Sequence, residues 1–174
     1  MALATVIIKE TNGAAPGTVY PVSAAVTLTL SNMGIADTAE TSLSSGYAIP
    51  AGSNSYEKFQ RLEVYANAAG DTIQNIKVWE VGTIPATDTH YCGQCQLAGY
   101  TTPTKSNSII ATTQPFPLTV GDAIALKIGG TVNGLISTTG FSDYLVHQIR
   151  VGATTTTGPA APLTMYWQYD EYSA

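Results

Sequence analysis

The stretch LTMYWQY, residues 163 to 169, decides how the fold of this chain is interpreted. Core-forming side chains occupy every second position, namely Leu163, Met165, Trp167 and Tyr169. Side chains alternate between the two faces of a β-strand, so this spacing predicts a strand with one face in a core. The opposite face carries Thr164, Tyr166 and Gln168 and is left for solvent or for a partner.

The same period of two recurs along the chain, and helical spacing is scarce. Regular alternation is found at 26–30, 124–128 and 145–151, and less regular strand-like runs lie at 5–9, 73–81, 90–97 and 108–112. Turn-forming residues separate these runs, as in Asn12-Gly13, Gly70-Asp71, Gly129-Gly130 and Asn133-Gly134. We therefore expect an all-β domain of eight or nine short strands with little helix, built as a sandwich or a barrel.

The segment from Ser55 to Asn67 fits two structures. Tyr56, Phe59, Leu62 and Ala66 would share a helix face, whereas Leu62, Val64 and Ala66 would share a strand face and leave Phe59 needing a bulge. A Gly-Asp turn and the apolar run 73–81 follow directly, so the two-strand interpretation is favoured.

Composition narrows the classes of function. The chain has 174 residues, 11% of them charged, and a net charge of −5. Its seven basic residues are scattered singly, which argues against nucleic-acid binding because phosphate contacts need clustered Lys and Arg. No stretch approaches the ~20 apolar residues of a membrane span, and the first residues lack the features of a signal peptide. We expect a soluble single domain that is made in the cytoplasm.

The stretch HYCGQCQ, residues 90 to 96, holds both cysteines and one of the two histidines. A redox motif is disfavoured, because a reactive C-x-x-C needs a helix N-terminus that this strand context does not provide. A metal site is the stronger rival: it would combine Asp88, His90 and Cys92 on one strand face, Cys95 after a turn at Gly93, and His147. The simpler interpretation, which we prefer, has buried reduced thiols and a satisfied core histidine at position 147. We therefore assign no metal and no cofactor.

No other group of residues indicates catalysis. Asp170 and Glu171 are adjacent on a strand and point to opposite faces, while Asp122 and Asp143 are typical of turns. There is no nucleophile elbow and no glycine-rich phosphate loop before a helix. We expect a protein that is not an enzyme.

Tyrosine is the remaining signal, with ten Tyr against three Phe. Tyrosine combines a large contact area with one polar end, which suits partly wet contacts between proteins or with sugars. We assign an interface to Tyr166, Gln168, Tyr47 and Tyr172. The alternative is that these side chains only cap the edge of the core.

Two blocks resemble known proteins: SNSYEKFQRLEVYANAAGDTIQNIKVWEV (53–81) and TMYWQYDEYSA (164–174). Together with a start at Met and no leader, they are similar to small structural proteins of tailed bacteriophages, most like a capsid decoration (cement) protein. The resemblance implies a jelly-roll sandwich at 18–174 and a first strand or capsid-binding arm at 1–17. It also implies residence in the virion, self-association (a trimer is favoured) and contact with the major capsid protein or another virion protein.

Three alternatives remain open. One is a subunit of a tail, a head fibre or another filament. The second is a β-sandwich module that binds carbohydrate or a cell surface through an exposed Trp79 or Trp167. The third, a metal enzyme on a cupin-like barrel, is poor because the chain has only two distant histidines.

Overall fold

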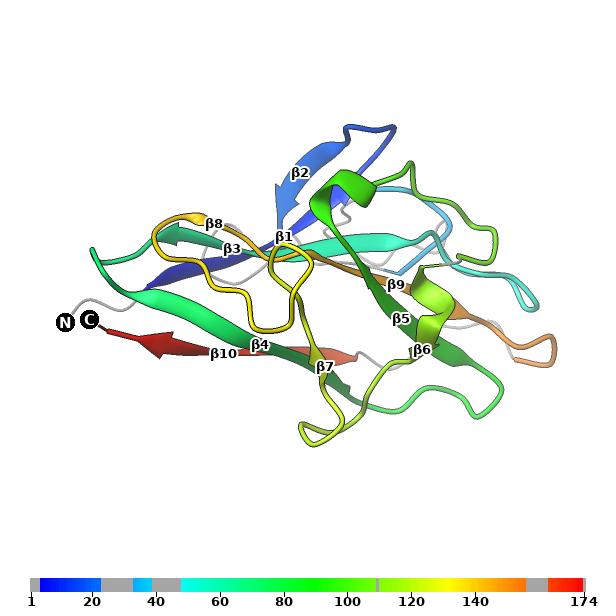
Figure 1. Cartoon of the computed structure of the whole chain (residues 1–174). Coiled ribbons are helices and arrows are strands. Elements are labelled where there is room, and N and C mark those ends of the chain that lie inside the picture. The colour runs from blue at the N-terminus through cyan, green and yellow to red at the C-terminus, as the bar shows by residue number, and fades with distance from the viewer. Residues whose placement is uncertain (1–3, 23–32, 39–47, 109, 156–162, 174) are drawn as a thin grey trace.

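The chain folds into two antiparallel β-sheets and almost no helix (Figure 1). This computed structural model describes residues 4–22, 33–38, 48–108, 110–155 and 163–173. Within them, the larger sheet has seven strands in the order β2-β1-β3-β9-β5-β6, with β8 also paired to β3, and the smaller sheet has the order β10-β4-β7. The strands are β1 (Thr5–Asn12), β2 (Thr18–Pro21), β3 (Lys58–Ala66), β4 (Thr72–Val81), β5 (Thr89–Cys95), β6 (Gln114–Pro115), β7 (Ile124–Ala125), β8 (Gly140–Phe141), β9 (Tyr144–Arg150) and β10 (Thr164–Tyr172).

The main core lies between the two sheets. Leu62, Val64 and Leu145 of the larger sheet pack in one buried cluster with Ile76 and Val78 of the smaller sheet. Figure 1 shows β1, β3 and β8 of the larger sheet above β4 and β10 of the smaller sheet. The predicted all-β architecture is confirmed, and its two packed sheets are consistent with a sandwich.

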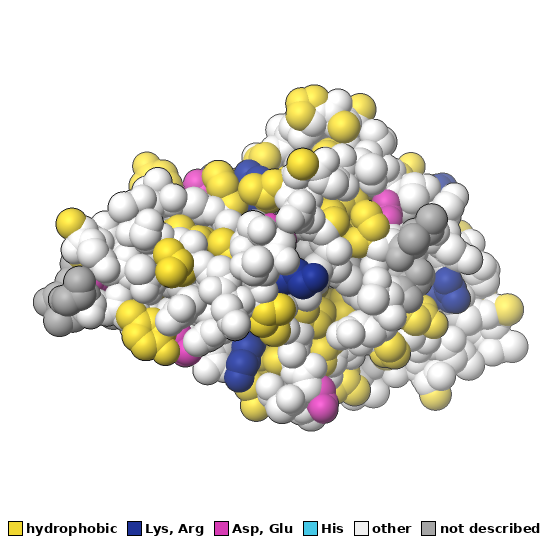
Figure 2. Space-filling model, viewed as in Figure 1, with side chains coloured by type: hydrophobic (Ala, Val, Ile, Leu, Met, Phe, Trp, Pro, Cys, Tyr) yellow, Lys and Arg dark blue, Asp and Glu magenta, His cyan; other side chains and the backbone are white. Residues whose placement is uncertain are grey.

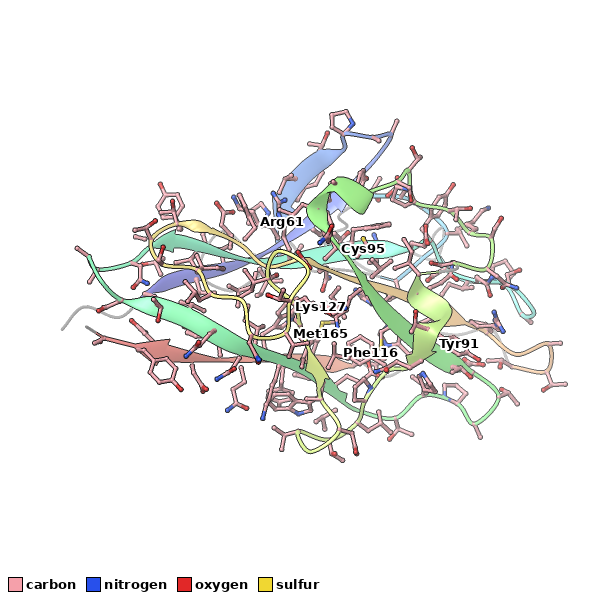
Figure 3. All side chains as sticks on the ribbon, in the orientation of Figure 1. Arg61, Tyr91, Cys95, Phe116, Lys127 and Met165 are labelled. Atoms are coloured by element: carbon pink, nitrogen blue, oxygen red, sulfur yellow. The ribbon has the colours of Figure 1, made fainter. Side chains whose placement is uncertain are left out.

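Strand β10 follows the alternation predicted for residues 163–169. Met165, Trp167 and Tyr169 pack against the main core, whereas Tyr166 and Gln168 are exposed on the outer face of the smaller sheet. Figure 3 shows Met165 in the space between the sheets. The period of two thus places Met165, Trp167 and Tyr169 on the inner face and Thr164 and Gln168 on the outer face, as predicted.

Strand β4 keeps its apolar residues on one face by means of an irregularity. Ile73 and Ile76 are both buried although they are three positions apart and would face opposite sides of a regular strand. Asn75 lies between them with a φ of 54°, and the register against β10 shifts between Gln168 and Asp170. This bulge restores the inward phase for Ile76 and Val78.

The ambiguous segment 55–67 is a strand, as favoured. β3 pairs with β1 on one side and with β8 and β9 on the other. The bulge that we expected for Phe59 is absent, because its side chain points to the opposite face from Leu62 and packs edge-on against Tyr100 and Tyr144 at 4.9 and 5.6 Å between ring centroids. A second, smaller core therefore lies on the outer side of the larger sheet.

Two expected strands differ in the structure. Residues 108–112 do not form a strand: the chain makes a 3-10 turn at Ala111–Thr113, because the Ser108 hydroxyl accepts the Ala111 N–H (2.8 Å) and the Thr113 hydroxyl donates to the Ile110 carbonyl (2.7 Å). The run 124–128 is a strand only at Ile124–Ala125. The run 26–30 lies outside the described residues.

The segment 1–17 contains β1, which lies between β2 and β3 in the larger sheet. Glu10, Thr11 and Asn12 of this strand are buried. The described part of the segment is therefore an integral strand and not a free arm. The described part of the chain holds no helix with the length and hydropathy needed to cross a bilayer.

A buried charged pair lies at the polar end of the larger sheet. The Lys58 ammonium donates to the Glu10 carboxylate at 3.0 Å, and both side chains are fully buried. Gln60 and Asn12 also donate to Glu10 through their amides. Burying charge is tolerated here because each group is paired and hydrogen-bonded.

Candidate functional site

Strand β5 carries the segment His90–Cys95 and runs straight through it. Every residue from Thr89 to Cys95 pairs with β9, so the turn that we considered at Gly93 is absent. Gly93 sits in mid-strand because the Ile110 carbonyl occupies the space of a side chain: an added Cβ would lie 1.9 Å from that oxygen. The glycine serves close packing and not a change of direction.

The straight course of β5 sends the two thiols to opposite faces of the sheet. Cys92 belongs to the main core between the sheets, and Cys95 packs with the second core around Phe59. Figure 3 places Cys95 at the end of β5 away from Phe116. Both cysteines are free. They cannot act together on one ligand without breaking the strand.

Burial makes both thiols weak acids. Burial, and then the charge of Glu80, raises the pKa of Cys92 to about 12. Burial, and then the charges of Asp143 and Glu57, raises the pKa of Cys95 to about 11. Thiolates are the nucleophiles and metal ligands of cysteine chemistry, so these positions favour reduced, unreactive side chains.

The two histidines meet in the core and form a chain with a glutamate. The Glu80 carboxylate lies 2.6 Å from Nδ1 of His90, and Nε2 of His90 lies 2.9 Å from Nδ1 of His147. The three side chains are 1%, 4% and 2% exposed, respectively. Glu80 belongs to the smaller sheet and the histidines to the larger one, so this chain crosses the main core.

One ring nitrogen in the hydrogen-bonded series Glu80–His90–His147 has no partner. Nε2 of His147 is buried and makes no hydrogen bond. Nε2 of His147 lacks a partner in either tautomer, because the hydrogen bond between the two rings uses Nδ1 of His147 whichever ring donates. Burial, followed by the nearby charges of His90 and Lys58, lowers the pKa of His147 well below its usual value, so the ring is neutral at pH 7. The core histidine predicted at position 147 is thus buried but only half satisfied.

The residues weighed for a metal site are not brought together. His90, Cys92 and His147 share the inner face of the larger sheet, but Cys95 points to the other face. Asp88 is occupied elsewhere, since its carboxylate accepts the Gly152 N–H at 3.0 Å and the Thr155 hydroxyl. Among the residues that the structure describes, no three His, Cys, Asp or Glu side chains could hold a metal ion.

Of the acidic residues predicted to form turns, Asp122 lies in one, whereas Asp143 lies in the link before β9 and its carboxylate holds the separate Gly129-Gly130 turn. The Asp143 carboxylate accepts the N–H groups of Gly129 and Gly130 at 3.1 and 2.9 Å, and Asp122 accepts the Thr119 hydroxyl at 2.9 Å. Asp170 and Glu171 go to separate partners, Asn75 and the backbone of Ala4. Each of these four carboxylates has a different partner, so no two of them form a facing acid–base pair.

The outer face of the smaller sheet carries an aromatic pair. Tyr166 of β10 and Trp79 of β4 are directly opposite in the ladder, and their rings are stacked with centroids 5.3 Å apart and planes within 10°. Tyr166 is 44% exposed and Tyr172, further along β10, is 49% exposed. Gln168 lies between them and is exposed as well. We call Trp79, Tyr166, Gln168 and Tyr172 the outer aromatic face; Tyr47, the other expected interface residue, lies outside the described residues.

Large apolar side chains are exposed elsewhere as well. Beyond the outer aromatic face, those more than about a third exposed are Val19, Tyr20, Tyr65, Val81, Leu97, Leu118, Val120, Val132, Leu135 and Phe141. Figure 2 shows one face of the molecule on which hydrophobic groups are interspersed with uncharged polar atoms and only a few charges. Because this face carries few charges, little electrostatic repulsion opposes its contact with another protein.

Sequence reasoning missed Glu80, although a signal for it exists. Glu80 occupies the inward phase set by Ile76 and Val78, so alternation places a carboxylate in the core. A buried carboxylate needs a partner, and histidine is a suitable one. Lys58 and Gln60 alternate with Leu62 along β3, so the same pattern places their polar side chains on the inner face of the larger sheet.

No family model, curated protein or solved structure matches this chain.

Proposed function

We propose that this protein is a non-enzymatic structural subunit of a phage virion, with a sandwich of jelly-roll type, that decorates or stabilises the capsid. It would do so by associating with copies of itself, a trimer being favoured, and by contacting the shell through the major capsid protein or another virion protein. The observation that carries the proposal is the outer aromatic face, which is exposed in the isolated chain.

Physical chemistry supports a contact role for this face. Tyr and Trp are enriched at protein interfaces because they bury a large area at a low entropic cost. Here the stack on Trp79 already orders the Tyr166 ring, so little side-chain freedom remains to be lost when a partner binds. A preordered aromatic surface fits a binding subunit better than a free-standing monomer.

Attachment to a shell would be multivalent. Each subunit contributes a modest contact, and an oligomer engages several neighbouring shell subunits at once. The effective concentration of the second and third contacts then makes attachment strong without any single large interface.

Filament subunits are the related alternative, because a head-to-tail contact that does not close produces a fibre instead of a ring. Carbohydrate binding is a weaker alternative. It relies on the same aromatic pair, but Tyr166 and Trp79 turn one ring face toward each other, which leaves fewer free faces for a sugar. Trp167, the other candidate, packs against the core.

The test is the assembly state of the purified protein, measured by light scattering and by negative-stain microscopy. Closed rings or compact oligomers support the decoration role, and fibres favour the filament alternative. The variant Tyr172→Ser should weaken association, whereas Tyr65→Ser should not, because Tyr65 is exposed on β3 of the larger sheet, away from the outer aromatic face. A protein that stays monomeric at high concentration would contradict the proposal.

A further inference from the structure

We infer that β10 pairs edge to edge, in antiparallel orientation, with β10 of a second copy of this chain. This inference rests on the self-association in the proposed function and names one surface through which copies of the chain make contact. It would join the smaller sheets of two copies into one continuous sheet.

A comparison of the outer strands of the two sheets singles out β10. Those other than β10 have four residues or fewer: β2 (Thr18–Pro21), β6 (Gln114–Pro115), β7 (Ile124–Ala125) and β8 (Gly140–Phe141). Two of them end in proline, which cannot donate a ladder hydrogen bond. Strand β10 has nine residues and, within the described residues, pairs only with β4.

The first half of β10 lacks the devices that usually protect an edge. Proteins block pairing at exposed edges with charged side chains, proline, bulges or short strands. Residues Thr164–Gln168 contain no charge and no proline and form a regular ladder with β4, and the register shift and the two acidic residues come only after Gln168. A regular edge of this kind is a template for another strand.

The charge pattern of β10 selects the orientation of the partner strand. Its two acidic residues, Asp170 and Glu171, lie near the C-terminal end, and residues 164–169 carry no charge. Parallel pairing would set the acids of both copies side by side, and like charges on neighbouring strands are destabilising. Antiparallel pairing sets each acidic end beside the uncharged end of the other copy.

Full overlap of two nine-residue strands places a two-fold axis at the middle residue, Gln168. Gln168 of one copy then lies opposite Gln168 of the other, and the exposed Tyr166 and Tyr172 side chains of both copies form one stripe on the same outer face. A two-fold contact closes at two copies. In the trimer favoured above, the contact would join neighbouring trimers and not the subunits within one.

The test uses charge at the expected axis. Gln168→Lys should weaken association at least tenfold in analytical ultracentrifugation, because it sets two lysines against each other beside Lys77, the exposed residue opposite Gln168 on β4 of each copy. Gln168→Glu should weaken association less, because Lys77 offsets the new charge. An equimolar mixture of the two variants should restore association, because opposite charges then meet. Tyr65→Lys is the matched control, an exposed strand position of the larger sheet, and should associate like the original protein. Urea unfolding should show that all three variants are folded.

Hydrogen exchange supplies the second readout: in β10, amides should become protected as concentration rises, whereas a dilute monomer that already protects every β10 amide would overturn the inference. If the protein associates but neither Gln168 variant weakens it, the inference fails while the proposed function stands. If the original protein never associates, both fail.

Discussion

At the scale of single residues, the chemistry of this chain is set by burial. His90, Cys92 and His147 have the side chains of a metal or redox site, yet all three are buried in the core, away from solvent. Residue type and spacing suggested a metal site, but among the described residues no three ligands converge on one position. The same alternation that places His90 and Cys92 together sends Cys95 to the other face.

The first prediction concerns the thiols. At pH 8, a thiol with a pKa of about 12 or 11 is almost fully protonated. A disulfide reagent such as DTNB should therefore react with the folded protein roughly 100-fold or more slowly than with the unfolded chain. Cys95, which has the lower pKa and is only partly buried, should react before Cys92.

Mass spectrometry after partial labelling identifies which thiol reacted, and labelling in denaturant gives the reference rate. Rapid reaction of Cys92 in the folded state would show that the core around β5 is open to solvent, which contradicts this structure.

At the scale of elements, the strands are positioned by close backbone contacts that a hydrophobic pattern does not reveal. Strand β5 is the clearest case, because the Ile110 carbonyl approaches it where Gly93 has no side chain. The 3-10 turn that carries this carbonyl replaced the expected strand at 108–112, through hydrogen bonds of Ser108 and Thr113 to nearby backbone. Local side-chain bonds therefore overrode the strand propensity of this run.

The second prediction follows from that contact. Gly93→Ala should destabilise the protein by about 1–3 kcal/mol, because the new methyl group must displace the Ile110 carbonyl or bend β5. Urea unfolding followed by circular dichroism measures the change.

Gly121→Ala is the matched control, since an added Cβ there meets only the Thr119 hydroxyl at an ordinary 3.7 Å. Its effect should stay within about 0.5 kcal/mol, as for most surface substitutions. Equal stability of the two variants would contradict the close packing at Gly93.

At the scale of the whole molecule, the two sheets are joined by a polar link as well as by the apolar core. Glu80 comes from one sheet, and His90 and His147 come from the other. Protonation of His147 would therefore act on the packing of the two sheets. The groups that face His147 are His90 and Cys92 on β5, Lys58 on β3 and Phe116 after β6.

The third prediction is a loss of stability in acid. The pKa of His147 is lowered in the folded protein, so below pH 6.5 the unfolded chain binds a proton that the folded chain does not. The free energy of unfolding should therefore be at its full value above pH 6.5. It should then fall with decreasing pH with a slope of up to about 1.4 kcal/mol per unit from this group.

The variant His147→Gln removes this titration, so its profile between pH 7 and 5 should be flatter than that of the original protein. Denaturant unfolding at each pH gives both profiles. Parallel profiles would show that His147 titrates normally and is not buried as described.

The sequence by itself determined the class of fold and the outline of its strands. Alternation of apolar and polar residues predicted β4, β9 and β10, and it correctly favoured a strand over a helix at 55–67, because side-chain period is a local property of the backbone. It also predicted that Cys92 is buried and that Asp122 lies in a turn, whereas Cys95 is only half-buried and Asp143 lies in the link before β9. Only the tertiary structure decided which strands are neighbours, and therefore that Glu80, His90 and His147 meet and that Tyr166 stacks on Trp79. These contacts join residues distant in sequence, and local periodicity assigns a side chain to a face but does not specify what lies opposite it.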